Sequence, residues 1–312
     1  ACTGVGAAVD AMAADVAAVR AAVAEVGVEL VGAGIDPVRP PQRIVHSPRY
    51  DAMERYFDDD GPEGRTMMAS TASLQVNLDL GPASDLEDRW RLAHAVSPVL
   101  AAAFANSPIV AGRATGMRSS RLATWSRLDR SRTAPGLGCD WADYALDALV
   151  LLVRDADGTY VPEATRQSFR QWILHGHALG WPDEDDLAYH LTTLFPPVRP
   201  RGWMEVRVVD SLPDPWWRVA VAVTAALLDD PAAASEARAA TVDVAGLWVE
   251  AAHHGLAHPA LAVAARRCFA AALDALGRLD VDAVTTDACR EYFERYIARE
   301  RCPADDVLAE VR

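Results

Sequence analysis

The stretch Ser73–Leu80, with the sequence SLQVNLDL, alternates strictly between polar and apolar residues. Because successive side chains of a β-strand point to opposite faces, this period of two predicts a half-buried strand. The apolar side chains are expected to face a core. The opposite face presents a row of short polar groups from Ser73, Gln75, Asn77 and Asp79, and this composition favours a lined cavity over a merely solvated surface.

A second alternating stretch, Trp203–Asp210, has the sequence WMEVRVVD and predicts another strand of the same kind. Glu205 and Arg207 lie two residues apart, so their side chains project from the same face. Such a pair forms either a surface ion pair of little energetic weight or a site that binds a metal ion and a phosphate. In the second case the carboxylate holds the metal and the guanidinium holds the phosphate.

Helical periodicity precedes and follows these strands. One apolar stripe over residues 7–26 ends at Gly27, and residues 28–31 are expected to form a short strand. A capping box at residues 84–87 predicts the start of another helix. From residue 214 to the end the pattern is helical, so we expect a single α+β domain over residues 1–312 with a helical layer at 214–312.

The composition excludes several classes of protein. Asp and Glu number 44 against 30 Lys and Arg, and the net charge of −14 argues against nucleic acid as the main partner. No apolar run reaches the roughly 18 residues needed to span a bilayer, so no membrane association is expected. The five cysteines have no CxxC spacing and no signal peptide is visible, which favours free thiols in the cytoplasm.

The chain contains no lysine, and all 30 of its basic residues are arginine. A P-loop, which needs a lysine, is therefore excluded, and any ATP chemistry must use another fold. A loop-rich segment over residues 109–140 holds a group of arginines, which is either a solvated loop or part of a binding site: Arg113, Arg118, Arg121, Arg127, Arg130 and Arg132.

Arg121 and Trp125 in this segment have helical spacing. Residues four apart adjoin on one face of a helix, and a guanidinium beside an indole suits a small carboxylate ligand. The histidine pairs His175/His177 and His253/His254 are weak metal candidates, because no cysteine or acid has zinc-like spacing to them.

Several ordered motifs between roughly residues 31 and 215 support a family resemblance. They are Met67-Met68, Thr71–Leu80, Phe104–Pro108, Arg121 with Trp125, Asp129 with Arg132-Thr133, Asp143–Asp147, His190–Pro197, Val198-Arg199 and Met204–Arg207. With these motifs the chain resembles the glutamate–cysteine ligase family. The resemblance is strongest to the branch shared by plant enzymes and the actinobacterial ligases of ergothioneine biosynthesis.

The resemblance implies a glutamine-synthetase-like fold, in which a curved, mainly antiparallel sheet forms a funnel-shaped active site wrapped by helices. It implies ATP-dependent joining of the γ-carboxylate of L-glutamate to the amine of L-cysteine through a γ-glutamyl phosphate, with Mg²⁺. The product, γ-glutamylcysteine, would serve ergothioneine biosynthesis. The alternatives are a carboxylate–amine ligase with another amine acceptor and a non-catalytic binding relative.

The resemblance also implies roles for individual residues. Gln75 and Glu205 match metal ligands, Arg207 matches a phosphate contact, and Arg121 with Trp125 matches residues that hold glutamate. Glu205 and Arg207 are therefore the expected catalytic pair. Further active-site candidates are Ser73, Asn77, Arg132, Thr133, His190 and Arg199. Relatives open with a strand that carries two glutamates aimed at the metals, and we expect this strand upstream of Ala1.

Overall fold

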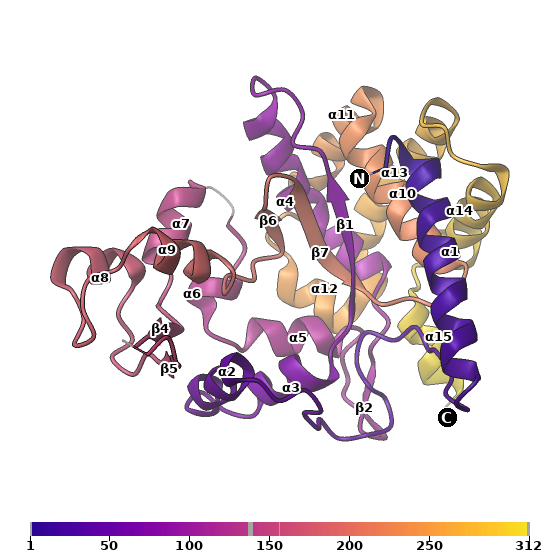
Figure 1. Ribbon diagram of the computed structural model, residues 1–312. Coiled ribbons are helices and arrows are strands. Elements are labelled where there is room, and N and C mark those ends of the chain that lie inside the picture. The colour runs from indigo at the N-terminus through magenta and orange to yellow at the C-terminus, as the bar shows by residue number, and fades with distance from the viewer. Residues whose placement is uncertain (1, 137–139, 156, 311–312) are drawn as a thin grey trace.

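The two alternating stretches pair with each other at the centre of the fold. In the computed structural model, which describes residues 2–136, 140–155 and 157–310, strand β1 (Ser73–Leu78) runs antiparallel to β7 (Met204–Asp210). Strand β6 (Val198–Pro200) pairs with the other edge of β7, so the sheet has the order β1–β7–β6 (Figure 1). The predicted strands are thus confirmed.

An irregularity in this pairing decides where the side chains of β7 point. Two residues of β7, Arg207 and Val208, lie opposite the single residue Gln75 of β1. Such a β-bulge shifts the alternation of side chains by one residue. Val208 and Val209 therefore both lie in the apolar core, and Asp210 returns to the polar face. Strict alternation along β7 would place the Asp210 carboxylate among apolar side chains.

The apolar face of the sheet packs against helices. Helices α4 (Leu86–Ala103) and α10 (Trp216–Asp229) contact the sheet directly, and their buried side chains join those of β1 and β7 in one core. Helices α11 (Pro231–Thr241), α13 (Pro259–Ala275) and α14 (Ala283–Arg295) form the layer outside them (Figure 1). The predicted α+β class with a helical C-terminal part is confirmed. A funnel formed by a curved sheet stays a prediction.

The other face of β1 and β7 meets short helices. Helices α2 (Pro48–Asp58), α3 (Glu63–Ser70) and α5 (Ser120–Ser126) lie beside the lower half of the sheet in Figure 1. A smaller group of elements extends from them, and we call this group the small lobe. It includes α6 (Arg130–Thr133), α7 (Trp141–Asp147), α8 (Phe169–His175) and α9 (Glu184–Leu191). The other described helices and strands are α1 (Val5–Ala24), β2 (Ile109–Val110), β3 (Arg113–Ala114), β4 (Leu152–Arg154), β5 (Tyr160–Pro162), α12 (Trp248–His254) and α15 (Pro303–Glu310).

Two local predictions are wrong. Residues 28–31 form no strand, because no described strand pairs with them, and Val31 is 64% exposed. Helix α4 begins at Leu86, within the predicted stretch, but the capping box itself does not form, since Ser84 donates its hydroxyl to Asp85 at 2.8 Å and α4 begins without a side-chain cap. By contrast, Gly27 ends the first helix at a φ of 72°, as predicted.

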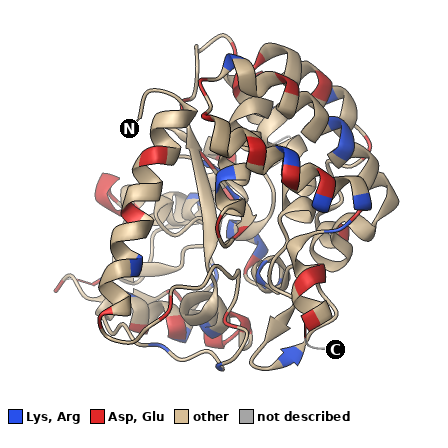
Figure 2. Cartoon of the chain, turned by 90° about the vertical axis from the view of Figure 1, so that its right-hand side faces the viewer, with Lys and Arg blue, Asp and Glu red and all other residues tan. Residues whose placement is uncertain are grey.

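The surface charges are mixed (Figure 2), and the described cysteines are free thiols, as predicted. Acidic and basic side chains alternate over the helical layer, and no large region of Figure 2 carries one sign alone. Cys2, Cys268, Cys289 and Cys302 form no disulfide, while Cys139 lies outside the described residues. Within the described ranges, no helix combines the length and the apolar character that crossing a bilayer would require.

Helix α4 buries a histidine that makes stability depend on pH. His94 is 1% exposed, its ring lies 4.7 Å from that of Trp90, and neither ring nitrogen has a partner among the described residues. Burial lowers the pKa of His94 from 6.5 to about 4. Since the unfolded chain then binds more protons between these two values, stability falls as the pH drops from 6.5 toward about 4.

We predict that His94→Phe reduces the loss of stability between about pH 7.5 and about pH 5 by about 2 kcal/mol at most. The free energy of urea unfolding, measured at about pH 7.5 and about pH 5, provides the test. The variant should match or exceed the wild type at the higher pH, because Phe removes two buried polar atoms without partners. An identical pH dependence in the two proteins would contradict the prediction.

Candidate active site

A cavity of about 310 Å³ lies beside the polar face of β1 and β7. Its polar wall includes Ser73 and Gln75 from β1, Arg207 from β7, Arg121 from α5 and Arg49 from α2. The remaining wall is mostly apolar and consists of Tyr50, Met53, Met67, Met68, Thr71, Trp125 and Phe195. Three guanidiniums beside an apolar surface suit a small anionic ligand.

Arg121 is fixed by the backbone and side chains of β7. Its Nε donates to Asp210 Oδ1 at 2.7 Å, and its Nη2 donates to the carbonyls of Val208 at 2.8 Å and Arg207 at 3.3 Å. The residue is only 4% exposed. Nη1 forms no hydrogen bond with any described residue. Its two N–H groups are therefore available to a ligand.

Trp125 lies one helical turn after Arg121 on α5, and both side chains line the cavity, as the spacing predicted. The indole ring packs edge-on against Phe195 with the ring centroids 5.5 Å apart. Its Nε1 is buried and has no acceptor in the part of the chain that the structure describes. A buried N–H without an acceptor is costly, and such orphan groups point to a partner that a ligand supplies.

Asp210 is a residue of this site that the sequence did not predict, as is Arg49 in the cavity wall. It is 1% exposed, and its carboxylate accepts four hydrogen bonds. Oδ1 accepts from Ser119 Oγ at 2.9 Å and from Arg121 Nε, while Oδ2 accepts from Asn106 N at 2.8 Å and Ser107 Oγ at 2.7 Å. The only signal in the sequence is the Asn106-Ser107 pair within the conspicuous FANSP motif.

Glu205 lies further along β7, directly opposite Asn77 of β1. Its Oε2 accepts from Arg199 Nη2 at 2.7 Å and from Arg207 Nη1 at 3.2 Å. Burial alone would raise the pKa of Glu205, but the hydrogen bond and charge of Arg199, with the charge of Arg207, lower it below its ordinary value. The side chain is therefore an anion at neutral pH, and no described residue bonds its Oε1.

Arg207 connects Glu205 with the cavity. Its guanidinium pairs with Glu205 and also lines the cavity wall beside Gln75. Burial, together with the nearby charge of Arg199, lowers the pKa of Arg207 to about 10. The group is still a cation at neutral pH, and its partial burial strengthens its attraction for a phosphoryl or carboxylate oxygen.

The side chains near Glu205 suit a magnesium ion that takes few ligands from the protein and most of its ligands from substrate phosphates and water. Glu205 carries a carboxylate oxygen that no described residue bonds, and two amide side chains belong to the facing strand, Asn77 directly opposite Glu205 and Gln75 two residues before it. Among the described residues, no group of three or more His, Cys, Asp or Glu side chains is placed to hold a metal. Mg²⁺ usually takes one or two carboxylates and completes its shell with water and substrate phosphates.

Three predicted candidates lie in the small lobe and do not line the cavity. Arg132 is fully buried, and its guanidinium donates to Asp129, Thr193, Tyr56 and the Leu149 carbonyl. The neighbouring Thr133 donates to a backbone carbonyl of its own helix, α6. Each of the two residues therefore supports the local structure of the lobe, and their part in catalysis stays a prediction.

His190 occupies a similar structural position. Its Nε2 lies 2.9 Å from the Ala145 carbonyl, its ring packs against Phe169, and burial lowers its pKa to about 4. The predicted arginine group also separates in space, since Arg118 pairs with Asp305 and Arg127 lies 3.9 Å from Glu63. Of that group, Arg121 alone is among the residues that line the cavity beside β1.

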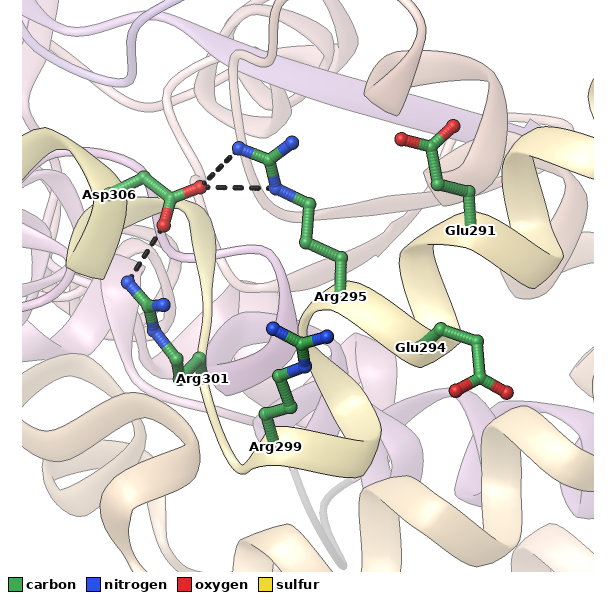
Figure 3. Close-up of a pocket in the computed structure, with 6 residues that line it drawn as sticks. All are labelled: Glu291, Glu294, Arg295, Arg299, Arg301 and Asp306. Atoms are coloured by element: carbon green, nitrogen blue, oxygen red, sulfur yellow. Dashed lines mark hydrogen bonds and ion pairs between the residues drawn. The ribbon is translucent and has the colours of Figure 1, made fainter.

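A second cavity, of about 430 Å³, lies among the C-terminal helices (Figure 3). It is lined by Glu291, Glu294, Arg295, Arg299, Arg301 and Asp306. Asp306 pairs with Arg295 at 2.8 Å and with Arg301 at 2.7 Å, so much of the positive charge in this cavity is already neutralised. The cavity beside β1 is therefore the better candidate for an active site.

Comparison with known proteins shows the family of the chain. A family model described as glutamate–cysteine ligase family 2 (GCS2) matches residues 1–310. The chain is 43% identical over 311 residues to "Glutamate–cysteine ligase EgtA" of Mycolicibacterium smegmatis, covering 96% of this chain and 72% of the relative. The corresponding protein of Mycobacterium tuberculosis is 42% identical over 324 residues, with 97% and 72% coverage.

A more distant relative is the chloroplastic glutamate–cysteine ligase of Brassica juncea. It is 34% identical over 217 residues, which cover 64% of this chain and 41% of the relative. The family model spans nearly the whole chain, and the mycobacterial relatives align with 96% and 97% of it. The chain therefore belongs to glutamate–cysteine ligase family 2.

Proposed function

We propose that the protein is a cytoplasmic glutamate–cysteine ligase that uses ATP and Mg²⁺ to make γ-glutamylcysteine for ergothioneine biosynthesis. Similarity to the mycobacterial ligases over most of the chain supports the activity and its biosynthetic setting. The structural observation that carries the proposal is the row of charged side chains on the polar face, with Arg121, Arg207 and Glu205 in that order. Its partners are small molecules.

The order of this row suits an amino acid with a carboxylate at each end. Arg121 is attached to the Asp210 end of β7 and Arg207 lies nearer to Glu205. L-Glutamate can therefore place its α-carboxylate on Arg121 while its γ-carboxylate lies beside Arg207 and the phosphate-binding end.

The chemistry needs an activated carboxylate, because a free carboxylate is a poor electrophile at neutral pH. Transfer of the terminal phosphoryl group of ATP to the γ-carboxylate gives an acyl phosphate and ADP. Arg207 is placed to stabilise the charge that develops on the phosphoryl oxygens. A bound Mg²⁺, held by Glu205, Gln75 and Asn77, would neutralise further phosphate charge.

The second step forms the amide bond. The uncharged amine of L-cysteine attacks the carbonyl carbon of the γ-glutamyl phosphate, the new C–N bond forms as the C–O bond to phosphate breaks, and the amine loses a proton. The apolar wall, which includes Met53, Met67 and Phe195, limits the access of water. Exclusion of water protects an acyl phosphate from hydrolysis before the amine arrives.

Release of ADP with L-glutamate and L-cysteine, and detection of γ-glutamylcysteine by mass spectrometry, test the proposed function. Replacing L-cysteine by other small amines separates this ligase from one with a different acceptor. Faster ADP release with another amine would reject the assignment of the acceptor. Glutamate or ATP binding without any turnover would indicate a non-catalytic relative.

We predict that Glu205→Gln lowers kcat by about 100-fold or more, because the variant loses the anionic oxygen next to Arg207 and the proposed metal site. Steady-state kinetics with saturating substrates provide the measurement. Glu163→Gln is a matched control, since Glu163 is a 2% exposed carboxylate that accepts hydrogen bonds from Thr165 in the small lobe. A Glu205→Gln enzyme as active as this control would reject the role of Glu205.

We predict that Arg121→Ala raises KM for L-glutamate by about 30-fold or more, because a charged hydrogen bond to the carboxylate is lost. KM for ATP should change by less than about threefold, since Arg121 lies at the other end of the row from the phosphate site. Initial rates with each substrate varied in turn separate the two constants. Equal increases in both would argue against a contact between Arg121 and glutamate.

A further inference from the structure

We propose that Asp210 is a positioning residue for the substrate carboxylate: it holds Arg121 so that Nη1 faces the cavity. This inference rests on the proposed function, since it takes L-glutamate as the ligand. Its basis is the division of the guanidinium into two parts. Nε and Nη2 are bonded to Asp210 and to the carbonyls of β7, whereas Nη1 has no partner among the described residues.

The Asp210 carboxylate is itself held from several directions. The donors that hold it come from the segment after α4, from the N-cap of α5, and from Arg121 within α5. Gly34 leaves room for it, because a Cβ at Gly34 would lie 2.5 Å from Asp210 Cγ. A carboxylate with four donors and no space to turn fixes the orientation of the guanidinium that it binds.

This arrangement restricts how a ligand can bind. Guanidiniums often bind carboxylates in a fork, through two parallel N–H···O bonds from different nitrogens. Nη2 already donates to two carbonyls and Nε to Asp210, so the substrate carboxylate must approach Nη1 alone. Asp210 thereby sets the direction from which the substrate enters and the point at which its α-carboxylate stops.

A comparison with Arg132 separates this role from a purely structural one. Arg132 is also buried with an acidic partner, Asp129, but its Nε, Nη1 and Nη2 all donate to the protein. Arg121 keeps one nitrogen without such a bond and lies in a cavity wall. The Arg121–Asp210 pair therefore combines a buried ion pair with a binding group, while the Arg132–Asp129 pair leaves no guanidinium nitrogen without a bond to the protein.

The test is a double-mutant cycle on L-glutamate binding with Asp210→Asn, Arg121→Ala and the double variant. An amide in place of the carboxylate must turn an NH₂ group toward either Arg121 Nε or Asn106 N, so one buried donor loses its acceptor. We expect Asp210→Asn to raise KM and the calorimetric Kd for L-glutamate about tenfold, with KM for ATP changed less than about twofold. In the Arg121→Ala background it should add less than about twofold.

Two further variants keep the test decisive if Asp210→Asn folds poorly. Ser119→Ala removes a hydrogen bond to the same oxygen that holds Arg121, and we expect KM for L-glutamate to rise about threefold. Because Ser119 also caps α5, the matched control is Ser168→Ala, which removes the cap of α8 and should leave this KM unchanged. Asp230→Asn controls for loss of a buried aspartate far from the cavity.

The outcomes distinguish the two proposals. Wild-type protein that makes no γ-glutamylcysteine would reject the proposed function. Active wild type, with Asp210→Asn and Ser119→Ala both at the wild-type KM for L-glutamate, would reject the positioning role alone. A tenfold effect of Asp210→Asn that persists in full in the Arg121→Ala background would also reject it, because Asp210 would then not act through Arg121.

Discussion

The ion pair between Arg121 and Asp210 is the interaction on which the active-site half of the molecule depends. Charges taken out of water are expensive unless they are paired and fully hydrogen-bonded. Here the carboxylate accepts four hydrogen bonds, and they come from the segment after α4, the N-cap of α5 and Arg121 itself. Loss of either partner would leave a buried charge, so these elements must meet β7 in one arrangement.

That pair depends in turn on the β-bulge. Without the extra residue opposite Gln75, the polar and apolar faces of β7 would alternate strictly, and Asp210 would lie on the core side. The bulge allows Val208 and Val209 to fill the core together while Asp210 reaches Arg121. A feature that disturbs the ladder of backbone hydrogen bonds is thus what places a buried acid beside the cavity.

The alternation of polar and apolar residues correctly predicted both long strands, and the helical spacing correctly predicted that Arg121 lies beside Trp125. Both predictions succeed because they depend only on neighbouring residues in the chain. Asp210 and Arg49 were missed, since their positions follow from a bulge and from the packing of α2 against the sheet. The apolar run at residues 28–31 has the composition of a strand. A strand also needs a partner for its backbone, and composition does not show whether one is present.

In this lysine-free chain, arginine side chains both support the structure and line the cavity. The two uses differ in how many guanidinium nitrogens are hydrogen-bonded to the protein. Arg132 donates from all three nitrogens to the small lobe, whereas Arg121 and Arg207 keep part of the guanidinium at a cavity wall.

The net charge of −14 does not oppose anionic substrates, because surface charges of both signs are mixed (Figure 2) and are screened beyond about 8 Å in physiological salt. A ligand in the cavity would directly contact the guanidiniums that line it, and these groups are only partly solvated. Their local field, rather than the charge of the whole molecule, therefore decides which ligands bind.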